Sequence, residues 1–263
     1  MKNTTKLMGL TCLFFAVVLS GCLNGGDSAN AAVGFEKEIK LSENNTILTF
    51  SFDANPTTGY DWTLTENQTG ILNKTIDNYT ISNASDTPAP GTPGIHTWAY
   101  TGETPGTVEL NFIYSRSFEE DSTIDNLTYV VEVKEDKSIE ILSSSTVGDN
   151  GAYAKGVMLE NESATLKFVF TENISAGYSW ENSVKPTNVL NKTFDGSLPA
   201  VDDFPRAPAI HTWKYLGSKA GTATVTFNCS APSGNLSERA VYIVSVDKNN
   251  KITILSILYD TFE

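Results

Sequence analysis

The 263-residue chain is poor in cysteine and histidine, with three Cys and two His, and this scarcity excludes several kinds of site. No Cys/His/Asp cluster has the spacing of a metal centre, and three cysteines cannot build a disulfide framework. Cys229 has no His partner nearby, so we expect a small buried or semi-exposed residue rather than a nucleophile. No phosphate-binding loop, cofactor motif or nucleophile–His–acid set is present. We therefore expect no metal, no cofactor and no enzymatic activity.

Positive charge is also scarce, because 18 Lys and Arg face 31 Asp and Glu for a net charge of −13. This balance argues against nucleic-acid binding, which favours a basic face. Helical periodicity is missing as well, since no 12-residue stretch carries it clearly. The acidic runs at 119–121 and 202–203 are expected to be solvated loop charges.

The N-terminus has the features of a targeting segment. A short basic stretch precedes an apolar run at 7–19, which is too short to favour a membrane span. Residues 19–22 (Leu-Ser-Gly-Cys) then resemble the lipobox of prokaryotic lipoproteins. This resemblance implies removal of residues 1–21, a lipid on Cys22 and a flexible tether at 22–34. The alternative is an ordinary signal peptide. Either way, we expect an exported protein. The lipobox resemblance further implies that it is attached to the outer face of the cell membrane only through its lipid.

Sequons support an exterior location, because each Asn-x-Ser/Thr tripeptide is a candidate glycan acceptor in an exported protein. Together with the lipid and the acidity, they suggest an archaeal cell-surface glycoprotein. The sequons begin at Asn44, Asn67, Asn73, Asn78, Asn83, Asn126, Asn161, Asn173, Asn191, Asn228 and Asn235.

The mature chain is an internal duplication, the first feature to seek in any sequence. Four blocks recur at offsets of about 113 to 118 residues: 60–62 at 178–180, 71–75 at 189–193, 95–100 at 210–215, and 106–107 at 221–222. We assign one domain to 35–143 and a second to 152–258. The Ser/Gly/Asn-rich stretch at 144–151 is the expected linker.

Each repeat is predicted to be a β-sandwich. Apolar and polar residues alternate in short runs separated by Gly, Pro and Asn, which is typical of half-buried strands. About 110 residues per repeat fits one sandwich domain. The runs are 47–52, 107–114 and 129–133 in the first repeat, and 165–170, 222–227 and 241–246 in the second.

The two copies distinguish scaffold from site. Trp62 and Trp98 have counterparts in Trp180 and Trp213, so we expect all four in the core. The two histidines, each followed by Thr-Trp in its repeat, are expected to form local hydrogen bonds. What only one copy retains is the better candidate for a binding site.

The loop at 55–60 differs between the copies. Its sequence, Asn55-Pro56-Thr57-Thr58-Gly59-Tyr60, combines a proline that fixes φ, two stiff β-branched residues and a permissive glycine. The second repeat retains Asn173 and Gly177 but replaces the residues between them with Ile-Ser-Ala. A rigid, uncharged loop on a strand scaffold suits insertion into the cleft of a partner.

The string Asn-Pro-Thr-Thr-Gly-Tyr-x-Trp resembles the signature loop of the chagasin family, protein inhibitors of papain-like cysteine peptidases. Two further features match that family. Arg116 and Phe118 stand where the family has Arg-Pro-Trp, and the Gly/Pro-rich segment 87–94 contains Gly91 and Gly94. The second repeat lacks both features. The resemblance implies tandem immunoglobulin-like sandwiches, so we predict an all-β chain of two such domains after a cleaved lipoprotein signal peptide.

The resemblance also implies a mechanism, in which three loops of the first domain occlude the cleft of a papain-like cysteine peptidase. The chain would act as a monomer without chemistry of its own. The alternative is a non-inhibitory, adhesin-like surface module. The expected peptidase-binding residues are Asn55, Pro56, Thr57, Thr58, Gly59, Tyr60, Gly91, Gly94, Arg116 and Phe118.

Overall fold

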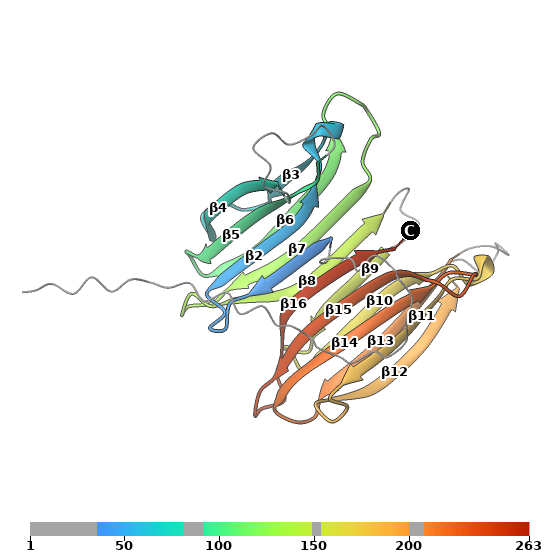
Figure 1. Ribbon diagram of the computed structural model, residues 1–263. Helices are drawn as coiled ribbons and strands as arrows, with labels where there is room; N and C mark the ends of the chain where they lie inside the picture. Colours follow the sequence, from blue (N-terminus) through green and yellow to red (C-terminus); the bar gives the residue numbers. More distant parts are fainter. Residues whose placement is uncertain (1–35, 82–91, 149–153, 200–207, 263) are drawn as a thin grey trace, which may run out of the picture. The chain divides into compact units, whose positions relative to one another are not determined.

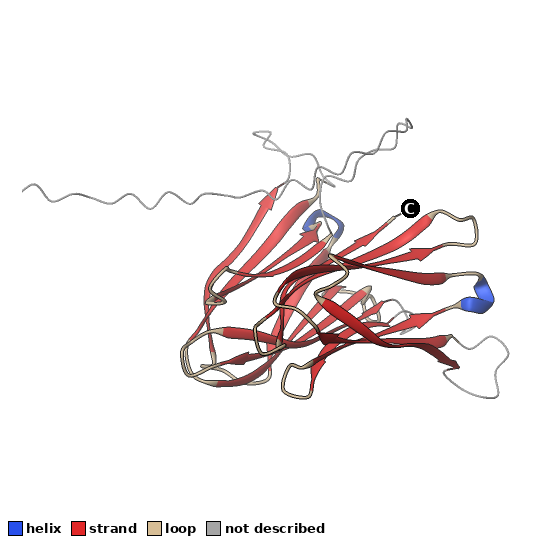
Figure 2. Cartoon of the chain, turned by 90° about the horizontal axis from the view of Figure 1, so that it is seen from below, coloured by secondary structure: helices blue, strands red, loops and turns tan. Residues whose placement is uncertain are grey.

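The computed structural model describes residues 36–81, 92–148, 154–199 and 208–262. Within these ranges the regular structure consists of antiparallel strands and two short 3-10 helices (Figure 1, Figure 2). Strand β2 shows why: its alternate residues Leu48, Phe50 and Phe52 are fully buried while the residues between them face outward. The predicted all-β sandwich architecture is confirmed.

Each repeat contributes eight strands. The first contains β1 (Lys37–Leu41), β2 (Ile47–Ala54), β3 (Tyr60–Glu66), β4 (Leu72–Ile81), β5 (Gly94–Gly102), β6 (Gly106–Arg116), β7 (Asp125–Val133) and β8 (Ile139–Gly148). The second contains β9 (Ala154–Glu160), β10 (Thr165–Glu172), β11 (Ser179–Lys185), β12 (Leu190–Pro199), β13 (Ala209–Gly217), β14 (Gly221–Ser230), β15 (Leu236–Val246) and β16 (Ile252–Thr261).

The strands form two eight-stranded sheets, and each sheet draws four strands from each repeat. One sheet has the order β11-β14-β15-β16-β1-β2-β5-β4, and the other has β12-β13-β10-β9-β8-β7-β6-β3. Strand β1 therefore pairs with the C-terminal strand β16, and β8 pairs with β9. The strands of the two repeats thus continue one another rather than ending at a domain boundary.

The segment expected as a linker takes part in this continuity. Residues 144–148 belong to β8, which pairs with β7 on one side and β9 on the other, and 149–153 lie outside the described residues. The signal peptide, Cys22 and the tether also lie outside them. Among the described residues, no helix has the length and apolarity that a membrane span requires.

The register of the junction strands fixes the direction of each repeat. Lys37, at the start of β1, is opposite both Phe52 near the end of β2 and Tyr259 near the end of β16. Val147, near the end of β8, is opposite Ala154 at the start of β9. The loops that follow β2 and β10 therefore lie at the same end of the two sheets.

A duplicated ion pair marks this end of the junction. Lys37 contacts Asp125 at 2.6 Å, and Lys155 contacts Glu238 in the equivalent position of the second repeat. All four side chains line one cavity of 190 Å³. The pairs are partly buried, so their main role is to neutralise charges that the junction withdraws from water.

One apolar core runs through both repeats. Its first half is built on Phe50, Phe52 and Phe112, whose rings lie 4.8 to 6.0 Å apart, and Phe168, Phe170 and Phe227 repeat the arrangement. The four tryptophans are buried as predicted, with exposed fractions of 7% or less. These aromatic clusters fix the strands whose ends carry the loops.

Candidate functional site

The loop after β2 is a single 3-10 turn, η1 (Pro56–Thr58). Pro56 occupies its first position, where a missing N–H costs nothing, and Asn55 precedes it with an extended φ of −139°. Gly59 ends the turn in the left-handed region at φ +86°, which an L side chain rarely adopts. Proline and glycine thus close a compact turn between two strands.

Hydrogen bonds within the loop hold this turn. The Asn55 carbonyl accepts from the Thr58 N–H at 3.0 Å and from the Thr58 hydroxyl at 2.6 Å. The Pro56 carbonyl accepts from the Gly59 N–H at 2.9 Å, and the Thr57 hydroxyl donates to Asn55 Oδ1 at 2.6 Å. The side chains of Pro56, Thr57 and Thr58 remain exposed. The tip therefore presents small side chains while two of its carbonyls are already engaged.

Tyr114 supports the loop from β6, a role the sequence reasoning missed. Its hydroxyl accepts the Asn55 N–H at 3.0 Å, and its ring stacks on Trp62 with centroids 4.7 Å apart. The signal was available in the duplication: Trp62 pairs with Tyr114, whereas Trp180 pairs with Cys229. The first repeat retains a tyrosine where the second has a small residue.

The loop after β6 packs beside the turn. Tyr60 and Arg116 are opposite one another in the β3–β6 pairing, and the guanidinium lies 4.4 Å from the Tyr60 ring centroid. Arg116 also pairs with Glu119 at 2.8 Å. A Cβ added to Gly59 would come within 2.8 Å of the Phe118 ring, so that ring lies against the glycine. Phe118 is still 75% exposed, an unusual position for a large aromatic side chain.

Gly94, at the start of β5, lies at the base of the same turn. It is opposite Ala54 on β2 and Ile81 on β4, so β4 ends and β5 begins beside the start of the Asn55 loop. Gly91 lies outside the described residues. Of the ten predicted residues, the structure therefore brings nine to one end of the first repeat.

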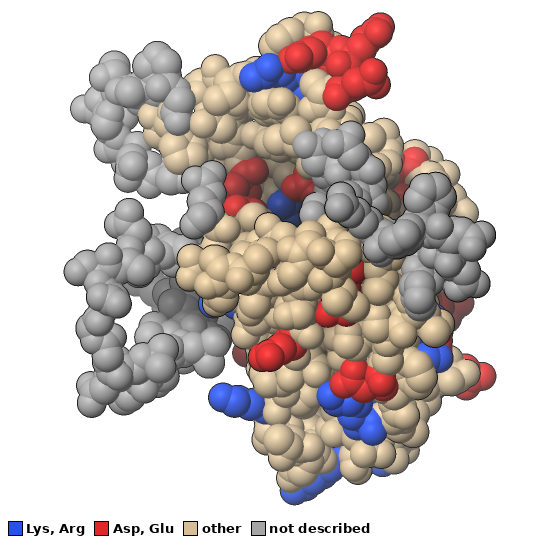
Figure 3. All heavy atoms as spheres, turned by 90° about the vertical axis from the view of Figure 1, so that its right-hand side faces the viewer, with Lys and Arg blue, Asp and Glu red and all other residues tan. Residues whose placement is uncertain are grey.

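The surroundings of this site are acidic. Residues 119–121 are exposed, as expected for solvated loop charges, whereas 202–203 lie outside the described residues. Figure 3 shows acidic side chains gathered at one extremity of its face with basic ones beside them. Asp53, near the end of β2, lines a cavity of 270 Å³ with Glu36, Lys37 and Tyr114. Partial burial and the nearby Glu36 raise the pKa of Asp53 to about 6.

The second repeat keeps the shape of the loop but not its chemistry. Helix η3 (Ile174–Ala176) follows Asn173, whose Oδ1 accepts the Ala176 N–H at 3.2 Å, and Gly177 ends it at φ +83°. Pro232 lies against Gly177 where Phe118 lies against Gly59. Cys229 is 3% exposed, as predicted, and burial raises the pKa of its thiol to about 12, which suppresses reactivity.

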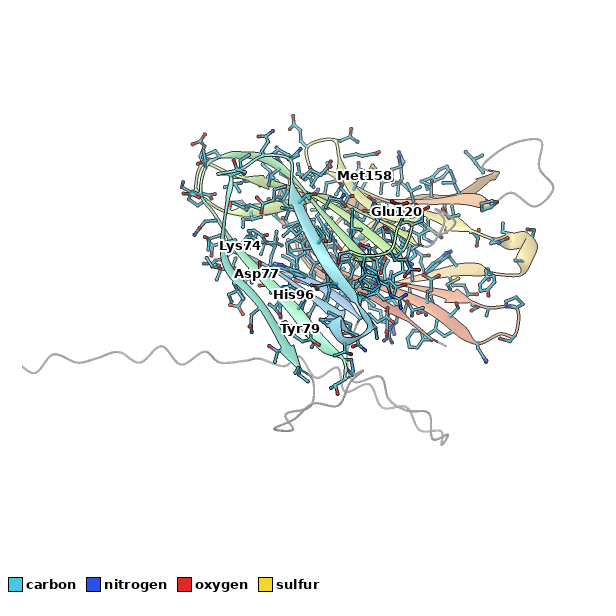
Figure 4. All side chains as sticks on the ribbon, turned by 90° about the horizontal axis from the view of Figure 1, so that it is seen from above. Lys74, Asp77, Tyr79, His96, Glu120 and Met158 are labelled. Atoms are coloured by element: carbon cyan, nitrogen blue, oxygen red, sulfur yellow. The ribbon has the colours of Figure 1, made fainter. Side chains whose placement is uncertain are left out.

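The histidines belong to the scaffold. His96 on β5 lies 2.8 Å from Asp77 on β4 and stacks on Trp98 with centroids 3.8 Å apart (Figure 4). His211 makes the equivalent contact with Asp195 at 2.8 Å. These are the local hydrogen bonds that the sequence predicted. Within the described ranges, no group of three or more His, Cys, Asp or Glu residues could hold a metal ion.

Comparison with known proteins yields one informative match. A family model described as "Chagasin family peptidase inhibitor I42" matches residues 40–133 and again 160–246, which together exceed half of the chain. No curated protein matches the sequence.

Solved structures add little. The match to a structure named BspA_C_WT covers 86% of this chain and 99% of the chain in that structure, at 11% identity and a TM-score of 0.24. The C-terminal domain of the AgI/II polypeptide BspA from Streptococcus agalactiae covers the same shares at 10% identity and a TM-score of 0.22. Likeness at this level bears on neither fold nor function.

Proposed function

The chain belongs to the chagasin family of peptidase inhibitors, and from this premise we propose that its first repeat inhibits papain-like cysteine peptidases by occluding their active-site cleft. Family members are inhibitors and not enzymes, so the protein itself is not an enzyme. The observation that carries the proposal is the cluster of 55–60, Arg116, Phe118 and Gly94 at one end of the first repeat.

The geometry of the turn supports binding without cleavage. A peptidase cleaves a bond only when the carbonyl lies in near-attack geometry with respect to its nucleophile. The Asn55 and Pro56 carbonyls accept hydrogen bonds inside the turn, and the 3-10 backbone of Pro56–Thr58 is not extended. A thiolate brought to this tip would meet hydroxyls and engaged carbonyls. The loop would therefore fill the cleft without being a substrate.

Preorganisation supports tight binding. Pro56 limits the conformations available to the free loop, and Tyr114 anchors its start through the Asn55 N–H. Phe118 supplies an exposed aromatic surface, and Arg116, held by Glu119, supplies a charged one. Aromatic and Arg residues are enriched among those that dominate interface energies. We assign Phe118 and Arg116 as the aromatic and polar anchors that grip the edge of the peptidase cleft beside the turn.

The proposal is tested by titrating papain with the mature protein and with two matched tryptophan variants. Thr58→Trp places a bulky ring on the exposed tip and should raise the inhibition constant at least about 30-fold, the equivalent of about 2 kcal/mol. Ala176→Trp makes the corresponding change in η3 and should leave inhibition unchanged. Full inhibition by Thr58→Trp, or no inhibition by the unaltered protein, would refute the proposal.

We further propose that the protein is exported, is anchored at the outer membrane surface through a lipid on Cys22 and acts there as a monomer. The support is the lipobox-like sequence at 19–22 after a short apolar run. One lipid chain gives only marginal anchoring, so a second is required. Cys22→Ser should release the protein from the membrane fraction of its host. Retention of that variant in the membrane fraction would contradict the lipid assignment.

A further inference from the structure

The two loop turns share a tripeptide geometry that inhibition does not explain. In the first repeat the Thr57 hydroxyl donates to Asn55 Oδ1 at 2.6 Å, and in the second the Ser175 hydroxyl donates to Asn173 Oδ1 at 3.1 Å. Each tripeptide opens a 3-10 turn that a left-handed glycine ends. Both are therefore Asn-x-Ser/Thr tripeptides that open the same kind of turn, with φ of −139° at Asn55 and −96° at Asn173.

The two tripeptides differ in their middle residue, and this difference decides whether the asparagine can be glycosylated. Asn-x-Ser/Thr accepts an N-linked glycan only when x is not proline. Pro56 therefore closes the Asn55 tripeptide to glycan transfer, whereas Ile174 leaves the Asn173 tripeptide open. One substitution separates an acceptor from a non-acceptor at equivalent positions of the two repeats.

Asn173 is well placed to be modified. Its Oδ1 is engaged by the Ala176 N–H and the Ser175 hydroxyl, but its Nδ2 makes no hydrogen bond within the described part of the chain. Ile174 beside it is 58% exposed, and residues 175–177 are exposed too. A glycan on Nδ2 would extend into solvent without disturbing the contacts that hold the turn.

The loops after β6 and β14 differ in the same way. Asn228 on β14 and Asn235 in the loop after it are exposed, and Pro232 of that same loop lies against Gly177. In the first repeat, the equivalent described segments 55–60 and 114–125 contain no acceptor tripeptide. Asn126 follows on β7, half-buried with its Oδ1 enclosed, and Asn83 lies outside the described residues.

We propose that Asn173 carries an N-linked glycan that covers the loop end of the second repeat, and that Pro56 keeps the equivalent end of the first repeat free for a peptidase. The donor is a lipid-linked oligosaccharide. Asn173 Nδ2 forms a bond to the anomeric carbon and loses one proton, while the bond from that carbon to the lipid phosphate oxygen breaks and the phosphate leaves with its electron pair. The proposal rests on export and, for its consequence, on the inhibitory function.

Glycan mapping tests the modification independently of inhibition. The full chain is produced in an exporting host that transfers N-glycans, and occupied asparagines are identified by mass spectrometry after enzymatic release in ¹⁸O-labelled water. We expect occupancy at Asn173 and none at Asn55. Pro56→Ala should gain a glycan at Asn55. Ile174→Pro and Ser175→Ala should each lose the glycan at Asn173, so one misfolded variant would not decide the result.

Two outcomes of the mapping would overturn the proposal. The first is an unoccupied Asn173 in the secreted, folded protein, whether or not other sequons are occupied. The second is a Pro56→Ala protein whose Asn55 remains unmodified.

The consequence for binding is tested with Pro56→Ala from two hosts. The glycosylated protein should inhibit papain at least about 30-fold less strongly than the same variant from a host without N-glycosylation. Equal inhibition with Asn55 occupied would overturn the masking role. Absence of inhibition by the unaltered protein would instead refute the proposed function and leave the glycan map standing.

Discussion

At the scale of single residues, Gly59 combines two constraints that can be separated by experiment. Its φ of +86° costs a non-glycine residue about 1–2 kcal/mol, and a Cβ there would meet the Phe118 ring at 2.8 Å. Gly70 has the same kind of backbone, at φ +82°, with nothing within 4 Å of the added Cβ. The pair therefore isolates the contact with Phe118 from the backbone strain.

We expect Gly59→Ala and Gly70→Ala to lower the free energy of unfolding by similar amounts, about 1 kcal/mol. Only Gly59→Ala should weaken papain inhibition, because it displaces Phe118 from the turn. Urea unfolding and inhibition assays of both variants measure the two effects. If Gly59→Ala inhibits as strongly as Gly70→Ala, the placement of Phe118 is irrelevant to binding.

Asp53 makes the stability of the folded protein depend on pH, and the sign of that dependence can be predicted. The residue is exposed overall, but its carboxyl group is partly buried, and this burial is the main reason that its pKa is raised to about 6. Repulsion from Glu36 and Asp260 raises the pKa further, and attraction to Lys37 partly opposes the rise. A raised pKa means that the folded state binds the proton more tightly than the unfolded chain. The stabilising contribution is therefore fully present below the unfolded value of 3.8 and is lost as the pH rises through about 6.

Asp53→Asn should accordingly stabilise the protein at pH 8 and have little effect near pH 3.5, as measured by thermal unfolding. Asp136 is the control of opposite sign, since hydrogen bonds from Ser138 lower its pKa. Asp136→Asn should destabilise the protein at pH 8 and lose its effect in acid. An Asp53→Asn protein that is less stable than its parent at pH 8 would contradict the assignment.

At the scale of elements, the sequence predicted what local patterns control. Alternation located the strands around Phe50 and Phe168, and Pro56 with Gly59 indicated a stiff turn, because both features act within a few residues. Arg116 and Phe118 could be assigned to the same site only through the family resemblance. Their actual contacts, over Tyr60 and against Gly59, depend on the register of β3 against β6.

The elements that sequence could not place are those defined by long-range pairing. Residues 144–148 are rich in Ser and Gly and read as a linker, yet they complete β8 because β7 and β9 provide hydrogen-bond partners on both sides. The role of Tyr114 likewise depends on a long-range contact, because the Asn55 N–H that its hydroxyl accepts lies 59 residues away in the sequence. In each case tertiary contacts override a local preference.

At the scale of the whole molecule, the duplication produces one folded body, within residues 34–263, that carries two unequal loops. Strand β16 hydrogen-bonds with β1, and the Tyr259 hydroxyl on β16 lies 3.3 Å from the Ser144 hydroxyl on β8 and 3.2 Å from that of Tyr242 on β15. A buried polar network of this kind links strands of both repeats. Neither repeat has a core or a set of paired strands that ends at its own boundary.

The two repeats should therefore unfold in a single transition, with equal calorimetric and van't Hoff enthalpies. Phe168→Ala, which removes a fully buried ring from the second repeat, should cost about 3–5 kcal/mol. It should also shift the urea midpoint at which papain inhibition by the first repeat is lost, because the site depends on strands that β16 holds in place. Two separate transitions, or an inhibition midpoint unchanged by Phe168→Ala, would show instead that the repeats fold independently despite their shared sheets.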